Sequence, residues 1–170
     1  MDIKSFIRDV PDFPKKGILF KDITPLLGNH AAFTEAIKAM ASHYNGTKIE
    51  YVAGIESRGF IIGTALAQAI GAGFIPMRKP GKLPYKTKKK EYSLEYGKDS
   101  VEIHEDALKK GQKVLLVDDV IATGGTARAA AELLREIGGD LVGIAFLVEL
   151  SFLKGTEKLK GEKIFSLITF

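Results

Sequence analysis

The chain has 170 residues, of which 45% are hydrophobic and 27% are charged. This composition indicates a globular protein rather than a disordered one, and a chain of this length typically folds as one domain. The net charge of +4 allows an anionic ligand without by itself indicating nucleic acid. The absence of cysteine excludes disulfides, thiolate nucleophiles and thiolate zinc sites, and it fits a reducing cytoplasm.

The N-terminal quarter of the chain combines an irregular segment with a helix. MDIKSFIRDV carries four charged residues, so we expect a short helix there and no signal peptide. The segment from Pro11 to Asn29 contains three prolines and two glycines and is predicted to be irregular. Helical periodicity begins behind Asn29, a good N-cap. The apolar face of this helix comprises Phe33, Ala36, Ile37, Met40, Ala41 and Tyr44.

Strands and helices then alternate along the chain. Buried strands are predicted at residues 51–55, 74–77, 114–117 and 141–148, helices at 58–70 and 126–137, and an extended arm at 100–104. Such alternation is typical of βαβ units, so we predict an α/β fold for residues 1–170, one domain with a central, mostly parallel sheet flanked by helices.

One uncharged stretch approaches the length of a membrane span. Residues 60–77 contain no charge over 18 positions. Four residues interrupt this stretch, namely Gln68, Gly71, Gly73 and Pro76. We therefore interpret it as an apolar helix followed by a short strand, and we expect no contact with a membrane.

The segment VLLVDDVIATGGT, residues 114–126, joins a buried strand to an anion-binding loop. Gly124 and Gly125 let the backbone turn tightly and approach a ligand. The helix that follows directs its free N–H groups and the positive end of its dipole at this loop. Thr123 and Thr126 add hydroxyl donors. In open parallel sheets ligands bind beyond the carboxyl ends of the strands, which is where this loop is expected to lie. Its N–H groups and hydroxyls favour a phosphate monoester as the ligand.

Two adjacent carboxylates, Asp118 and Asp119, stand at the start of this loop. They can accept hydrogen bonds from a ribose diol or lie near a magnesium ion, so a sugar phosphate suits both halves of the segment. The spacing matches neither a P-loop nor a dinucleotide-binding fingerprint. A plain strand end with an aspartate cap remains an alternative, as does a phosphoacceptor domain, which the glycine pair disfavours.

These thirteen residues resemble the 5-phosphoribosyl-1-pyrophosphate signature of the type I phosphoribosyltransferases. The resemblance implies that the 5-phosphate is held by Ala122, Thr123, Gly124, Gly125 and Thr126, and that Asp118 and Asp119 face the ribose hydroxyls. The segments GIESRGF, MRKPGKLP, SLEYG and VELSFLKG are similar to those of the family members that act on adenine. The resemblance covers the chain from about Pro11 to its last residue.

Two further loops are candidates for a pyrophosphate site. Arg58 follows one predicted strand, and Arg78 and Lys79 follow another. A lone arginine after a strand is more often a surface residue, but cations gathered at one sheet edge suit pyrophosphate oxygens. The resemblance assigns pyrophosphate to Glu56, Ser57, Arg58, Arg78, Lys79 and Lys82.

The stretch from Arg78 to Lys90 holds seven cations and no acid. It is either a solvated loop, a nucleic-acid surface or a lid that closes over an anionic substrate. We predict a flexible lid over residues 79–97, because only Tyr85 interleaves with the cations and no nucleic-acid motif is visible. The resemblance places Glu95 and Tyr96 over the reaction centre and leaves residues 86–90 without a role.

The resemblance also predicts how a base is held. Residues 11–28 resemble the hood that covers the purine, with Phe20 and Leu150 on either side of the ring. The backbones of Leu19 and Lys21 would meet its edge, and the carbonyl of Lys21 would accept the exocyclic amine. From the residues alone, core packing is the better explanation of Phe20 and Leu150.

The activity implied is transfer of ribose 5-phosphate from 5-phosphoribosyl-1-pyrophosphate to adenine, giving AMP and pyrophosphate in purine salvage. The candidate catalytic residues are Arg58, Glu95, Asp118 and Asp119. We expect Mg²⁺ to be bound through the substrate rather than held mainly by the protein, and a cytoplasmic homodimer that uses small-molecule substrates and no nucleic acid. His30, His43 and His104 are scattered, so no protein-bound zinc is expected.

Three alternatives stay open. The acceptor could be a 6-oxopurine or orotate, in which case the hood must donate to a carbonyl. A purine-responsive regulator could keep the fold without turnover, and it is expected to carry an added DNA-binding domain. An RNA-binding module that uses the lysine-rich stretch would bind polynucleotide with steep salt dependence.

Overall fold

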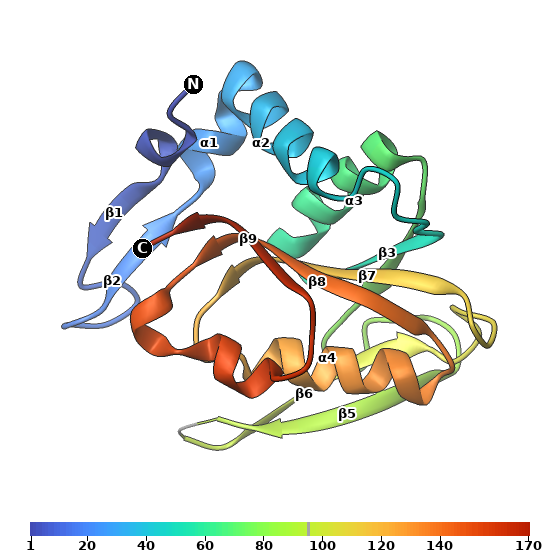
Figure 1. Cartoon of the computed structure of the whole chain (residues 1–170). Helices are drawn as coiled ribbons and strands as arrows, with labels where there is room; N and C mark the ends of the chain where they lie inside the picture. Colours follow the sequence, from blue (N-terminus) through green and yellow to red (C-terminus); the bar gives the residue numbers. More distant parts are fainter. Residues whose placement is uncertain (95) are drawn as a thin grey trace.

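The computed structural model describes residues 1–94 and 96–170, and these form a parallel sheet of five strands at the centre of the molecule (Figure 1). In spatial order the strands are β4 (Gly73–Met77), β3 (Tyr51–Ile55), β7 (Lys113–Ile121), β8 (Asp140–Glu149) and β9 (Ile164–Thr169). Every neighbouring pair in this sheet is parallel. The predicted α/β class with a mostly parallel sheet is therefore confirmed.

Helices cover both faces of this sheet. The helices on one face are α1 (Thr24–Gly28), α2 (His30–His43) and α3 (Arg58–Ile70), and α4 (Gly125–Glu136) lies on the other (Figure 1). Strand β7 explains why both faces are covered. Its Val114 and Leu116 are buried with α4, whereas Leu115 and Val117 are buried with α2 and α3. Because alternate side chains point to opposite faces, a continuous apolar run is buried from both sides.

Outside the central sheet, the described residues form two antiparallel hairpins. In the first, β1 (Arg8–Pro11) pairs with β2 (Leu19–Asp22). In the second, β5 (Thr87–Ser93) pairs with β6 (Lys98–His104), and this hairpin lies against α4 (Figure 1). The predicted base-covering hood at residues 11–28 contains the end of β1, β2 and α1, so the expectation that the segment from Pro11 to Asn29 is irregular was wrong.

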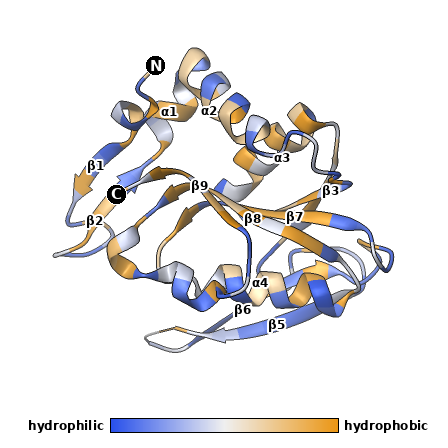
Figure 2. Ribbon diagram, in the orientation of Figure 1, coloured by the Kyte–Doolittle hydropathy of each residue, from blue (hydrophilic) through white to orange (hydrophobic). Residues whose placement is uncertain are grey.

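Strand β5 lies within residues 79–97, for which the sequence predicted a flexible lid and no regular strand. Figure 2 shows β5 as mostly hydrophilic, in contrast to β7 and β8. Of its inward-facing residues, Lys90 is held by ion pairs with Glu132 and Glu136 of α4, and Tyr92 packs on the core. Lys90 is held against α4 by charge and not by apolar burial. The sequence of β5 therefore lacks the alternation of apolar and polar residues that would predict a strand.

Several element bounds differ from those expected. The predicted N-terminal helix is a short 3₁₀ helix, η1 (Ile3–Phe6), followed by β1. Strand β7 continues to Ile121, paired with β8, so Asp118 and Asp119 lie within the strand and not after it. The 3₁₀ helices η2 (Ser151–Leu153) and η3 (Gly155–Leu159) and strand β9 carried no sequence signal that we identified. No helix among the described residues has the length and apolarity to cross a membrane.

Candidate active site

The connection from β7 to α4 encloses a small cavity at the carboxyl edge of the sheet. Its volume is about 100 Å³, and it is lined by Asp118, residues 120–127 and Phe146. Gly124 has a positive φ of 82° and caps α4, whose first turn contains no acidic residue. The free N–H groups and the positive end of the helix dipole are therefore not offset by an acid of the helix itself. The predicted phosphate-binding residues come together around this cavity, which we call the phosphate cradle.

The phosphate cradle is braced from behind by a second glycine. A Cβ on Gly124 would lie 2.2 Å from the carbonyl oxygen of Gly155, and a Cβ on Gly155 would lie 2.3 Å from that of Ala122. Neither distance is sterically possible, so both positions require glycine. Sequence reasoning assigned no role to Gly155, because its contact with Gly124 is created by the fold.

The two adjacent acids differ in their surroundings. Asp119 is only 4% exposed, and its Oδ2 lies 2.6 Å from Nε of Arg58, the first residue of α3. The pair is close enough for an ion pair but is not aligned as a hydrogen bond, and Oδ2 has no other hydrogen-bond partner among the described residues. Asp118 accepts a hydrogen bond from the Asp119 backbone N–H at 2.8 Å.

The surroundings of Asp118 favour a ligand with hydroxyl groups. Burial, and next the neighbouring Asp119 carboxylate, raise the pKa of Asp118 well above its ordinary value. A ligand that donates hydrogen bonds stabilises the charged form of a carboxylate and would relieve this unfavourable state. The pair is thus suited to the hydroxyls of a sugar.

Glu56 organises the cations of the neighbouring loop. Its Oε2 accepts hydrogen bonds from Nε of Arg78 at 2.9 Å and from the backbone N–H of Lys79 at 3.1 Å, and its Oε1 accepts one from Nζ of Lys82 at 2.5 Å. Burial works to raise the pKa of Glu56, but the hydrogen bonds from Lys82 and Arg78 outweigh it and lower the pKa to about 2. Glu56 is therefore a charged acceptor that gathers the predicted pyrophosphate-binding cations. Ser57 is the N-cap of α3 and makes no side-chain capping hydrogen bond.

Lys79 points to a different acid. Its ammonium group forms an ion pair with Asp99 of β6 and donates to the phenol of Tyr92 at 3.1 Å. Burial works to lower the pKa of Lys79, but these two hydrogen bonds outweigh it and raise the pKa. Arg58, Arg78, Lys79 and Lys82 are thus each held by a carboxylate of the protein itself.

The hood approaches the site through Phe20. Its ring lies 5.2 Å from the guanidinium carbon of Arg58 and makes an edge-on contact with Phe13 at 5.1 Å. Leu150 is half-buried after β8, and its backbone N–H donates to the carbonyl of Ile121 at 3.0 Å. The two residues thus flank the site from different elements, and their contact with a base stays a prediction.

The remaining predicted residues divide between the hood and the β5–β6 hairpin. The Leu19 side chain is 47% exposed, and Nζ of Lys21 is bonded to Asp9 at 2.5 Å. These side-chain positions do not test the predicted contacts of the Leu19 and Lys21 backbones with a base, which stay a prediction. Tyr96 is 83% exposed near the tip of the β5–β6 hairpin, and Glu95 lies outside the described residues.

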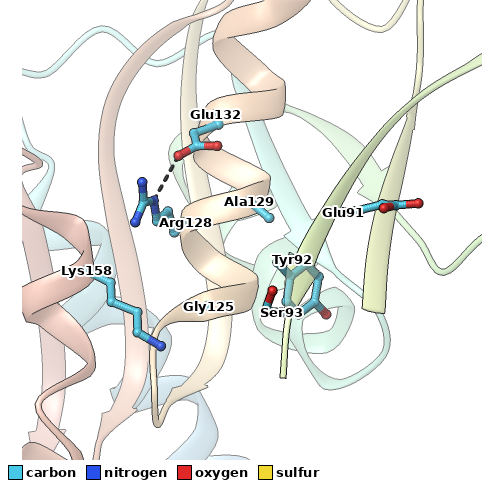
Figure 3. A pocket seen from close by; sticks show the side chains of 8 residues that line it. All are labelled: Glu91, Tyr92, Ser93, Gly125, Arg128, Ala129, Glu132 and Lys158. Carbon is cyan, nitrogen blue, oxygen red and sulfur yellow. Dashed lines mark hydrogen bonds and ion pairs between the residues drawn. The ribbon is translucent and has the colours of Figure 1, made fainter. Parts of the chain in front are cut away.

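A second groove, of about 360 Å³, lies between β5 and α4 (Figure 3). It is lined by Glu91, Tyr92, Ser93, Gly125, Arg128, Ala129, Glu132 and Lys158. Gly125 lines both this groove and the phosphate cradle. The groove therefore lies behind the first turn of α4, next to the cradle and not part of it.

Comparison with known proteins agrees with this geometry. Residues 25–166 match the sequence model of the phosphoribosyl transferase domain, which is the class that the sheet and the phosphate cradle define. The chain is 56% identical over 168 residues to the adenine phosphoribosyltransferase of Halothermothrix orenii, covering 99% of both chains. The chain therefore belongs to the adenine phosphoribosyltransferases.

Solved structures support the same assignment. The adenine phosphoribosyltransferase of Thermoanaerobacter pseudethanolicus superposes with a TM-score of 0.97 at 53% identity, covering 99% of this chain and 98% of that one. The enzyme of Saccharomyces cerevisiae, solved with adenine and an imino-altritol bisphosphate, superposes with a TM-score of 0.94 at 44% identity, covering 98% and 96%.

Proposed function

We propose that the chain transfers ribose 5-phosphate from 5-phosphoribosyl-1-pyrophosphate to adenine and releases AMP and pyrophosphate. The observation that carries this proposal is the phosphate cradle, lined by Asp118 and followed by the buried Asp119, because it suits a phosphate and sugar hydroxyls together. The yeast relative was solved with adenine, which supports this base as the acceptor.

The protein's main tasks in this reaction are orientation and charge stabilisation. A ring nitrogen of adenine attacks the anomeric carbon while the bond to pyrophosphate breaks, and positive charge develops on the sugar. Asp118 and Asp119 hold the hydroxyls and stabilise that charge. Arg58, together with the cations around Glu56, stabilises the negative charge that grows on pyrophosphate.

We further propose that Mg²⁺ enters with the sugar pyrophosphate. Among the residues that the structure describes, no three potential ligands of the types His, Cys, Asp or Glu lie together. The oxygens of Asp118 and Asp119 are suitable donors on the sugar side, and Oδ2 of Asp119 is buried without a hydrogen bond. The ion would neutralise charge on the leaving group.

The base site and the lid complete the proposal. Phe20 and Leu150 hold the purine between them, and the backbones of Leu19 and Lys21 read its edge. The tip of the β5–β6 hairpin carries Tyr96, and its closure excludes water that would hydrolyse the activated sugar. We propose that Glu95 accepts the proton that leaves the ring nitrogen of the base.

One incubation tests the function. The protein is mixed with adenine, 5-phosphoribosyl-1-pyrophosphate and Mg²⁺, and AMP is measured; absence of AMP would contradict the proposal. Free hypoxanthine, guanine and orotate are added in competition, and conversion of one of these in preference to adenine would reassign the acceptor. The variant Asp118→Asn with Asp119→Asn is the matched control, and unchanged rates there would remove the two acids from the mechanism.

We also propose a cytoplasmic homodimer. The composition without cysteine fits a reducing compartment, and the described residues include exposed apolar side chains at Phe13, Ile18, Phe152 and Leu153 that a second copy could cover. Light scattering coupled to gel filtration measures the mass of the particle, and a single-chain mass at micromolar concentration would contradict the dimer.

A further inference from the structure

The phenol of Tyr92 connects the two anion-binding regions of the site. Tyr92 lies on β5, half-buried, beside Gly125 at the start of α4 (Figure 3). Its Oη is 3.1 Å from Nζ of Lys79, 3.0 Å from Oδ2 of Asp99 and 3.2 Å from Oγ1 of Thr126. Lys79 belongs to the two loops that carry Arg58, Arg78, Lys79 and Lys82, which we call the cation loops. Thr126 lines the phosphate cradle.

In the observed arrangement, the ionisation of Asp99 and Lys79 sets the direction of each of these three hydrogen bonds. Burial works to raise the pKa of Asp99, but the hydrogen bonds it accepts, first from Lys79, outweigh burial and lower the pKa, so Asp99 is ionised and can only accept. Lys79 can only donate. The single phenol proton of Tyr92 is therefore given to Asp99, and its two lone pairs accept from Lys79 and Thr126.

This arrangement has a consequence for Thr126. Its hydroxyl has one proton, and that proton points at Tyr92 and not into the phosphate cradle. In the structure without ligand, Thr126 thus presents only lone pairs to the cavity, which a phosphate dianion would repel. The expectation that Thr126 simply adds a donor to the cradle is incomplete.

The chain of hydrogen bonds can reverse if Oη of Tyr92 and Oδ2 of Asp99 move slightly apart, because without the phenol proton these two oxygens repel each other at 3.0 Å. If Thr126 turns its proton toward a bound anion, Tyr92 can turn its own proton from Asp99 to the Thr126 oxygen across the same 3.2 Å. Asp99 keeps its ion pair with Lys79. Each donor then points toward the anion, from the Lys79 ammonium through two hydroxyls, and hydrogen bonds aligned in this way polarise and strengthen one another.

We propose that Tyr92 is a positioning residue that orients the Thr126 hydroxyl toward the 5-phosphate and links it to the Lys79 ammonium. Tyr92 does not line the phosphate cradle and therefore acts through Thr126. The identity of the anion rests on the proposed function. The coupling itself rests on the three contacts of the phenol oxygen.

The variant Tyr92→Phe removes the phenol oxygen and keeps the ring. Calorimetric titration with ribose 5-phosphate should show about tenfold weaker binding, the scale of one charge-assisted hydrogen bond. The KM for 5-phosphoribosyl-1-pyrophosphate should rise by about the same factor, while the KM for adenine stays unchanged. Tyr51→Phe is the matched control, because Tyr51 is a half-buried tyrosine at the amino end of β3 that packs on the same core. It should change neither constant.

A double-mutant cycle with Thr126→Val separates positioning from a general structural role. In the Thr126→Val background, Tyr92→Phe should weaken ribose 5-phosphate binding by less than about twofold, because the residue through which it acts is gone. Equal losses in both backgrounds would overturn the proposal. So would a Tyr92→Phe protein that unfolds at a lower temperature yet binds ribose 5-phosphate as the wild type does.

The same titration distinguishes this inference from the proposed function. Wild-type binding of ribose 5-phosphate that Tyr92→Phe leaves unchanged counts against the role of Tyr92 alone. Binding that responds to Tyr92→Phe in a protein that makes no AMP supports the role of Tyr92 and counts against the proposed function. A wild-type protein that does not bind ribose 5-phosphate overturns both.

Discussion

The two anion-binding regions of the site are built in opposite ways. The phosphate cradle is made of backbone around Gly124 and the start of α4, with a cavity already formed and no acid in the first turn of the helix. In the cation loops the anion-binding groups are side chains. Each of these cations already forms an ion pair with an acid of the protein, namely Glu56, Asp99 or Asp119.

This difference separates the energetics of the two ends of the proposed substrate. A phosphate enters a cavity whose backbone donors are in place, and only the Thr126 hydroxyl has to turn, so little reorganisation opposes binding. A pyrophosphate must replace carboxylates that the cations already hold, so its affinity is the difference between two ion-pair energies. The affinity for the 5-phosphate therefore depends on the shape of the phosphate cradle. The affinity for pyrophosphate depends on how readily the cations exchange their carboxylate partners for it.

The largest expected effect comes from disturbing the phosphate cradle. Gly155→Ala forces the added Cβ against the Ala122 carbonyl and displaces the cradle. Because displacement of a substrate-positioning group by about 1 Å can lower a rate about 100-fold, kcat/KM for AMP formation should fall by that order. Gly28→Ala is the control, since no described atom lies within 4 Å of the added Cβ there. Near-normal activity of Gly155→Ala would show that the cradle tolerates movement.

A smaller loss of activity is expected when an acid that pairs with the cation loops is removed. Asp119→Asn deprives Arg58 of its partner and the sugar of a charged acceptor. Asp119 is buried but the Arg58 side chain is 43% exposed, so the loss should be at the low end for such pairs, about 2 kcal/mol, and kcat/KM should fall about 30-fold. Asp140→Asn breaks an ion pair with Lys113 at the other edge of the sheet and should leave the rate within about twofold. Equal effects of the two variants would refute the distinction.

The pH dependence of stability tests whether Glu56 is as firmly paired as its geometry indicates. Its pKa falls from 4.5 to about 2 on folding, so it stabilises the fold above pH 4.5 and loses that contribution as the pH falls toward 2. The wild type should therefore melt several degrees above Glu56→Gln at neutral pH, and the gap should close over this window. Asp22 is paired similarly, so only the difference between the two melting curves is diagnostic. A gap that persists at pH 2 would argue against the pairing.

The smallest effect is expected at the contact between the β5–β6 hairpin and α4. Lys90→Met removes the ion pairs with Glu132 and Glu136, and calorimetry should show a melting temperature lower by about 2 °C at low salt. High salt should abolish the difference, because it screens exposed pairs. Lys88→Met, at an exposed position of the same strand, should change the melting temperature by less than the error of measurement.

The sequence predicts those features whose causes are local. The apolar run of β7 followed by two acids, a glycine pair and a helix start indicated both the α/β sheet and the cradle, since each part depends on neighbours within a few residues. Arg58 and Arg78 could be placed at one crevice because the carboxyl ends of parallel strands share an edge.

Features that depend on distant partners were not predictable. Tyr92 has meaning only beside Lys79 and Thr126, which come from other elements, and its strand carries mostly charged residues. Gly155 looks like an ordinary loop glycine until the fold brings it against Gly124. The internal partners of the cations are likewise set by tertiary structure, so the sequence alone suggested free cations where the structure has ion pairs.

The close approach of Gly155 to the cradle also bears on redesign of the enzyme. The short stretch from Leu150 to Gly155 begins beside the proposed purine pocket and ends against Ala122. Libraries that randomise this stretch to admit modified nucleobases should therefore keep Gly155, because any side chain there collides with the phosphate cradle. Diversifying β2 around Phe20 leaves the phosphate cradle untouched, although the Phe20 ring also contacts Arg58 of the proposed pyrophosphate site.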